Sequence, residues 1–104
     1  MSDLDVCKTM LPHIVQYTLS PAALAPAVRE FMEHRMPAEP VHRAALKTWA
    51  QEELAKLERM VGSGVSKIVG TGELAETSRK MTMLQTVIEE IEAFESGAAN
   101  RAAA

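Results

Sequence analysis

The sequence contains very little cysteine and few aromatic residues, and both shortages restrict the fold. The single cysteine, Cys7, excludes an intramolecular disulfide and a cysteine cluster for zinc, which suits a reducing compartment. Aromatic residues make up 4% of the 104 residues, against 47% for all hydrophobic residues, so the core must be mainly aliphatic. Straight-chain aliphatic residues lose little rotamer freedom in helices, whereas sheets favour β-branched and aromatic residues. The composition therefore predicts an all-α protein.

Long hydrophobic runs and an excess of positive charge are also missing. No apolar stretch approaches the roughly 20 residues that are needed to cross a bilayer. The segment 10–27 is fairly apolar, but Asp3 and Asp5 outweigh Lys8 ahead of it, which argues against a signal peptide. The formal net charge of −3 weighs against binding to a phosphate backbone. We therefore expect a cytoplasmic protein that binds neither a membrane nor nucleic acid.

Apolar residues recur at intervals of three and four along the N-terminal third, which indicates amphipathic helices. The first predicted helix begins near Ser2, and Pro12 must either kink it or end it at the preceding residue. Ser20 is predicted to cap the next element, with proline at its first position. Pro26 lies too far along for the same first turn, which favours a separate short turn over 21–25 and then a helix over 26–35.

The remaining chain predicts two longer helices. Pro40 opens the first of them, which ends near Val61, and the segment 65–69 between two glycine pairs fits either a helical turn or an extended conformation. The last predicted helix covers 73–95, and the small residues of 96–104 are expected to form a flexible tail. The sequence thus predicts one domain over residues 1–95, a compact bundle of four to five helices with a long amphipathic C-terminal helix.

Seven methionines supply flexible side chains that can fill a core or form a contact surface. The spacing assigns four of them to the core, namely Met10, Met32, Met60 and Met81. Met36 and Met83 fit interior positions less well and are candidates for a contact surface.

The last predicted helix carries an apolar stripe, and Val87 and Phe94 extend it sideways into a face that is wider than a single neighbouring helix needs. We therefore predict self-association through this stripe, with a homodimer as the expected form. The competing interpretation is that two helices of the same chain cover the stripe. The stripe consists of Leu74, Met81, Leu84, Ile88 and Ile91.

Glutamates crowd the C-terminal turns of the same helix, where the helix dipole is negative. Each carboxylate there is unfavourable by roughly a few tenths of a kcal/mol unless a cation compensates it. We predict that this acidic surface binds a protein partner, against the alternative of an ordinary solvated face. The acidic surface consists of Glu89, Glu90, Glu92 and Glu95.

Motifs that would carry chemistry are incomplete. Glu39 and His42 have the spacing of a di-iron bundle, but the second copy and the further carboxylates of such a site are missing. Gly70 and Gly72 begin a Gly-x-Gly-x-x-Ala sequence like that of a dinucleotide loop, without a second strand to complete the βαβ unit. Cys7 lies on an apolar helix face with poor cationic support for a thiolate. We therefore predict no catalytic residues, no metal site and no cofactor.

Three functions compete for such a bundle. We favour a non-catalytic protein–protein interaction module, a small adaptor, regulator or inhibitor, with a protein partner that the sequence does not identify. The alternative is a bundle that binds a small molecule or a metal, including an enzyme, and a pocket lined by His13, Tyr17, His34 or His42 would favour it. A helix-turn-helix DNA binder ranks third, because glutamates match its candidate cations one for one. These cations are Arg29, Arg35, Arg43 and Lys47.

Overall fold

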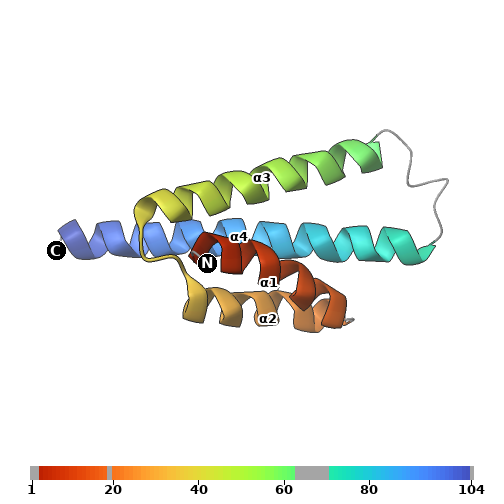
Figure 1. Cartoon of the computed structure of the whole chain (residues 1–104), viewed down its shortest axis with the longest axis horizontal. Coiled ribbons are helices and arrows are strands. Elements are labelled where there is room, and N and C mark those ends of the chain that lie inside the picture. Colours follow the sequence, from red (N-terminus) through yellow and green to blue (C-terminus); the bar gives the residue numbers. More distant parts are fainter. Residues whose placement is uncertain (1–2, 19, 63–70, 104) are drawn as a thin grey trace.

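A computed structural model describes residues 3–18, 20–62 and 71–103 of the chain. Over these residues the chain forms helices and no strands, which confirms the predicted all-α class (Figure 1). The helices are α1 (Asp3–Tyr17), α2 (Pro21–Arg35), α3 (Pro40–Gly62) and α4 (Thr71–Ala103).

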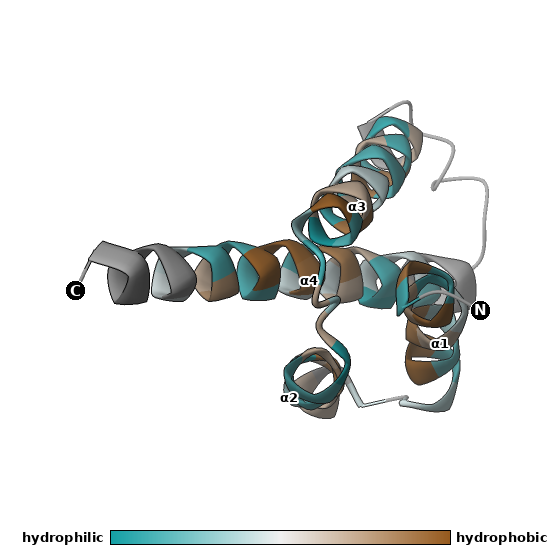
Figure 2. Cartoon of the chain, turned by 60° about the vertical axis from the view of Figure 1, so that its left-hand side comes forward, coloured by the Kyte–Doolittle hydropathy of each residue, from teal (hydrophilic) through white to brown (hydrophobic). Residues whose placement is uncertain are grey.

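Helix α4 forms the axis on which the other helices pack. It contacts α1, α2 and α3, and α1 in turn contacts all three other helices. In Figure 2, α3 lies on one side of α4 and α2 on the other, and hydrophobic segments of α4 lie where its neighbours gather. The longest dimension of the molecule is 52 Å, which matches the length of a helix of 33 residues at about 1.5 Å per residue.

The core is aliphatic, as the composition predicts, and every helix contributes to it. Its side chains recur three or four residues apart within each helix, so each helix turns one face inward. The buried hydrophobic residues are Cys7, Leu11 and Val15 of α1, Leu24, Val28 and Met32 of α2, Leu46 and Ala50 of α3, and Met83, Leu84, Val87 and Ile91 of α4.

Two interior prolines do not end the helices that contain them. Helix α1 continues through Pro12, and α2 begins at Pro21 and includes Pro26, so the predicted separate turn over 21–25 is wrong. An interior proline costs about 3 kcal/mol through a lost hydrogen bond and a clash with the preceding turn. Buried Leu11 and Val15 lie on either side of Pro12, so packing in the core offsets that cost. Helix α2 begins at Pro21 after extended Ser20, as predicted, but the Ser20 side chain makes no capping hydrogen bond.

The observed helix ends differ modestly from the predicted ones. Helix α3 ends at Gly62, close to the predicted Val61, and α4 begins at Thr71. Helix α4 also continues to Ala103, whereas the sequence predicted that it ends at Glu95. The flexibility of 96–104 stays a prediction, and the segment 65–69 lies outside the described residues.

The methionines are distributed differently from the prediction in three cases. Met32 is buried as predicted, but Met10 and Met60, which were assigned to the core, are 43% and 48% exposed. Met83, which was assigned to a contact surface, is buried because it shares the inner face of α4 with Val87, four residues later. Met60 lies in the last turns of α3, ten residues beyond buried Ala50.

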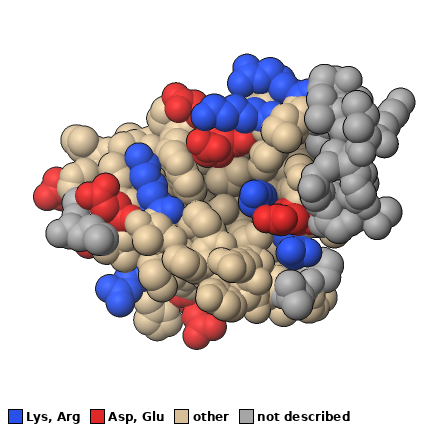
Figure 3. All heavy atoms as spheres, turned by 45° about the vertical axis from the view of Figure 1, so that its right-hand side comes forward, with Lys and Arg blue, Asp and Glu red and all other residues tan. Residues whose placement is uncertain are grey.

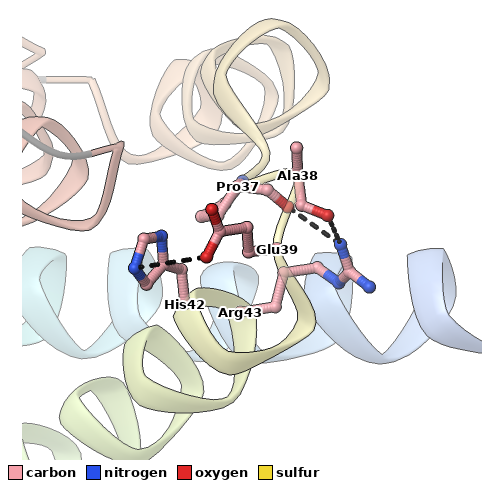
Figure 4. Close-up of polar contacts among 5 residues, drawn as sticks. All are labelled: Pro37, Ala38, Glu39, His42 and Arg43. Carbon is pink, nitrogen blue, oxygen red and sulfur yellow. Dashed lines mark hydrogen bonds and ion pairs between the residues drawn. The ribbon is translucent and has the colours of Figure 1, made fainter.

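The connection between α2 and α3 is held by Arg43, which the sequence placed among surface cations. Arg43 Nη1 donates hydrogen bonds to the carbonyl oxygens of Pro37, at 2.9 Å, and Ala38, at 2.8 Å (Figure 4). Its guanidinium also lies over the ring of Phe94 in α4. Arg43 therefore joins the connection to the central helix, and only 9% of the residue is exposed.

Candidate interaction surface

Helix α1 presents an apolar and aromatic face to solvent. Met10, His13 and Tyr17 follow one another at intervals of three and four, which places them on one face of the helix. All three are exposed, Tyr17 most strongly at 78%. The rings of His13 and Tyr17 are stacked, with centroids 6.3 Å apart and an interplanar angle of 15°. We call these three side chains the α1 outer face.

The sequence segment that contains the α1 outer face has no charged residues. Residues 9–28 include no Lys, Arg, Asp or Glu, so the second half of α1 and the first half of α2 are uncharged. Figure 3 shows a broad area with few charged side chains in the lower central part of the molecular surface, over α1 and the start of α2. A face of this kind binds through apolar and aromatic contacts, since it offers no ion pairs.

The predicted acidic surface is partly neutralised by neighbouring helices. Glu90 Oε1 lies 3.6 Å from Arg29 Nε of α2, and Glu92 Oε1 lies 3.7 Å from Lys47 Nζ of α3. Glu89 and Glu95 are exposed and form no ion pair within the described part of the chain. The compensation that the sequence of α4 lacks thus comes from α2 and α3, which only the fold brings near.

The predicted self-association stripe divides between the core and the surface. Leu84 and Ile91 are 2% and 0% exposed, because the other helices of the same chain cover them. Met81 and Ile88 are half-buried, and Ile88 packs against the core. The side chain of Leu74 lies outside the described residues. The competing interpretation, that helices of the same chain cover the stripe, therefore holds for two of its five residues. Self-association through the remaining residues of the stripe stays a prediction.

The cations of the third-ranked DNA-binding function are mostly engaged inside the molecule. Arg29 and Lys47 form ion pairs with glutamates of α4, and Arg43 is buried. Arg35 is exposed. Arg29 is exposed as well, but glutamates of α4 already pair with Arg29 and Lys47, so the four cations form no unpaired basic patch in the described part of the chain and give no support to DNA binding.

Each of the three histidines contacts a residue nearby in sequence, and His13 stacks on Tyr17. His34 Nδ1 lies 2.8 Å from the carbonyl oxygen of Glu30, one turn earlier. His42 Nε2 lies 3.8 Å from Glu39 Oε2 across the start of α3 (Figure 4). Over the described residues, no group of three or more His, Cys, Asp or Glu side chains is placed to hold a metal ion.

Cys7 is a core residue of α1. Its thiol is fully buried, and Sγ donates a hydrogen bond to the carbonyl oxygen of Arg35 at 3.4 Å. Burial raises the pKa of the Cys7 thiol, and the nearby carboxylate of Asp3 raises it further, while Arg35 acts in the opposite direction. A thiol with a raised pKa is a poor nucleophile at neutral pH, so Cys7 behaves as a small hydrophobic residue.

The glycine motif and the membrane expectation can be compared with the structure only in part. Gly70 lies outside the described residues, and Thr71 and Gly72 already belong to α4. Among the described helices, none has a stretch apolar enough to span a bilayer.

Comparison of the chain with protein-family models, curated proteins and solved structures found no match.

Sequence reasoning missed the α1 outer face as a candidate site. It considered Tyr17 only as a possible pocket residue, whereas Tyr17 is largely exposed. The signal that could have found the face is the uncharged segment 9–28, whose polar residues are too few to cover the outer side of a helix.

Proposed function

We propose that this protein is a non-catalytic protein–protein interaction module that self-associates through the α1 outer face. The observation that carries the proposal is the exposure of Tyr17 beside Met10 and His13 in a segment without charges. Tyrosine and methionine are enriched in interfaces. Tyrosine brings a large contact area at a low cost in conformational entropy, and methionine adapts its flexible side chain to the partner surface.

The lack of charge favours a second copy of the chain as the partner. The chain carries a formal net charge of −3, so most pairings of two copies bring like charges together. A two-fold symmetric contact places the same patch on both sides, and an uncharged patch avoids that repulsion. Apolar burial contributes about 25 cal/mol per Å² of area removed from water, which an aromatic side chain supplies efficiently.

The packing of the interior also supports a surface function. The buried hydrophobic side chains of the described residues form one cluster, and none of the three histidines belongs to it. We also propose that exposed Glu89 and Glu95 form a second contact surface for a different protein partner. A cytoplasmic location stays part of the proposal.

Light scattering over a range of protein concentrations tests the proposal. We expect a dimer mass at high micromolar concentration for the wild type and a monomer mass for Tyr17→Lys, which would bury an unpaired charge in the contact. Val41→Lys is the matched control, because Val41 is 73% exposed but lies on α3. Its mass should equal that of the wild type.

Two results would overturn the proposal. A wild-type monomer at several hundred micromolar would remove self-association altogether. A dimer that survives Tyr17→Lys but dissociates with Ile88→Glu would move the contact to the exposed part of the α4 stripe.

A further inference from the structure

We propose that the groove between α1, α3 and α4 is a second site, which binds a small ligand with an apolar body and a carboxylate group. The groove begins beside the α1 outer face, since Gln16 lies one turn from His13, but its lining residues in α1 are Pro12, Val15 and Gln16 and include none of the three outer-face side chains. The site therefore goes beyond the proposed function and can be tested without it.

One end of the groove is a hollow of about 250 Å³ with a largely apolar lining. Trp49 and Leu57 of α3 face Met83 and Leu84 of α4 across it, and Pro12 closes it on the side of α1. Glu53 and Lys80 also line this hollow. Its volume is close to the lower limit of about 300 Å³ for small-molecule pockets, so a ligand body of medium length fits better than a large one.

The other end is a polar hollow of about 480 Å³ between α1 and α4. It shares Pro12 and Lys80 with the apolar hollow, so the two adjoin. The remaining lining residues are Val15, Gln16, Glu76 and Arg79. One ligand can therefore place an apolar body in the first hollow and a polar head group in the second.

The charges along the groove favour an anionic head group. Glu53 Oε1 lies 3.3 Å from Lys56 Nζ, and Glu76 Oε1 lies 3.5 Å from Lys80 Nζ, so cations already compensate both carboxylates. Arg79 Nε, in contrast, is buried and has no hydrogen-bond acceptor in the described part of the chain. A buried N–H group without an acceptor is unfavourable, and a guanidinium binds a carboxylate through two parallel hydrogen bonds. Arg79 lines the polar hollow, so a ligand carboxylate there would supply the missing acceptor once the guanidinium turns toward it.

Intrinsic fluorescence provides a direct test, because Trp49 is the single tryptophan of the chain and lines the apolar hollow. Octanoate is the probe, and octan-1-ol is the matched uncharged probe. We expect a saturable change of Trp49 emission with octanoate, and a much weaker response to octan-1-ol. Arg79→Gln should weaken octanoate binding about tenfold or more, the effect of losing a charge-assisted hydrogen bond.

Arg59→Gln is the control variant, since Arg59 is exposed on α3 and does not line the groove. It should bind octanoate as the wild type does. If Arg79→Gln fails to fold by circular dichroism, Arg79→Lys retains the charge, loses the paired hydrogen bonds and should show intermediate affinity.

The proposal is overturned if millimolar octanoate gives no saturable change, or if octan-1-ol binds as tightly as octanoate. Equal losses of affinity in the Arg79 and Arg59 variants would likewise overturn it. Light scattering on the same samples separates these failures from a failure of self-association, because the groove variants should keep the wild-type mass.

Discussion

The guanidinium of Arg43 lies 4.8 Å from the centroid of the Phe94 ring, which places a buried cation over an aromatic face. The same guanidinium donates hydrogen bonds to two carbonyl oxygens of the α2–α3 connection. A buried charge is tolerated only when hydrogen bonds and favourable electrostatics replace the lost water. Arg43 therefore holds the α2–α3 connection against the start of α3 and joins both to α4 through Phe94.

Removing the guanidinium should therefore destabilise the protein. Arg43→Met keeps much of the side-chain volume but loses both hydrogen bonds and the contact with Phe94, so we expect the free energy of unfolding to fall by about 2 kcal/mol. Urea denaturation followed by circular dichroism measures the change. Arg35→Met, at an exposed position, should change it by less than about 0.5 kcal/mol. Equal effects of the two substitutions would contradict the role of Arg43.

The buried thiol of Cys7 should make stability depend on pH in the alkaline range. Its pKa in the folded chain is raised above the ordinary value of 9.0, so the folded state keeps a proton that the unfolded chain loses. This contribution is fully present below about pH 9 and is lost as the pH rises through the raised pKa. We expect the wild type to lose more stability between pH 8 and pH 10.5 than Cys7→Ala does. Parallel losses in the two proteins would show that Cys7 does not contribute.

Ile91 should stabilise the single chain rather than a dimer. The side chain is fully buried by helices of the same chain, so Ile91→Ala should lower the free energy of unfolding by about 2–4 kcal/mol. The loss should be the same at low and at high protein concentration. If denaturation shows instead that the loss appears only where a dimer forms, Ile91 belongs to an interface between chains.

The ion pairs of the acidic surface should contribute little to stability and should be sensitive to salt. Glu90→Gln removes the contact with Arg29, whose side chain is 52% exposed, so we expect a loss of less than about 1 kcal/mol. At 1 M salt, where the screening length is about 3 Å, the loss should largely disappear. Glu89→Gln serves as the control, because Glu89 is exposed and outside these pairs. A loss that persists at high salt would indicate a role beyond charge pairing.

The helical class and most of the core follow from local patterns in the sequence. The three- and four-residue spacing of core residues, such as Leu84, Val87 and Ile91 in α4, depends on helix geometry alone, so it can be read without knowledge of the partner helices. The helix boundaries at Pro12 and Pro26 could not be predicted in this way. Tertiary packing offsets the local cost of these prolines, and that packing depends on residues far away in sequence.

The candidate sites were harder to predict, because they depend on which helices meet. The acidic turns of α4 have no nearby cations in the sequence of that helix, yet Arg29 and Lys47 reach Glu90 and Glu92 from two other helices. Arg43 shows the same limit, since nothing in the local sequence places Phe94 over it. Charge counts along one helix therefore overstate the uncompensated charge on that helix.

Nuclear magnetic resonance spectra recorded at low and at high protein concentration test the central claim, that this chain associates through the α1 outer face. We predict concentration-dependent shifts of the Met10 methyl and the Tyr17 and His13 ring signals, with the Met32 methyl in the core unchanged. Shifts confined to Met81 and Ile88 of α4, with the α1 signals constant, would contradict the account.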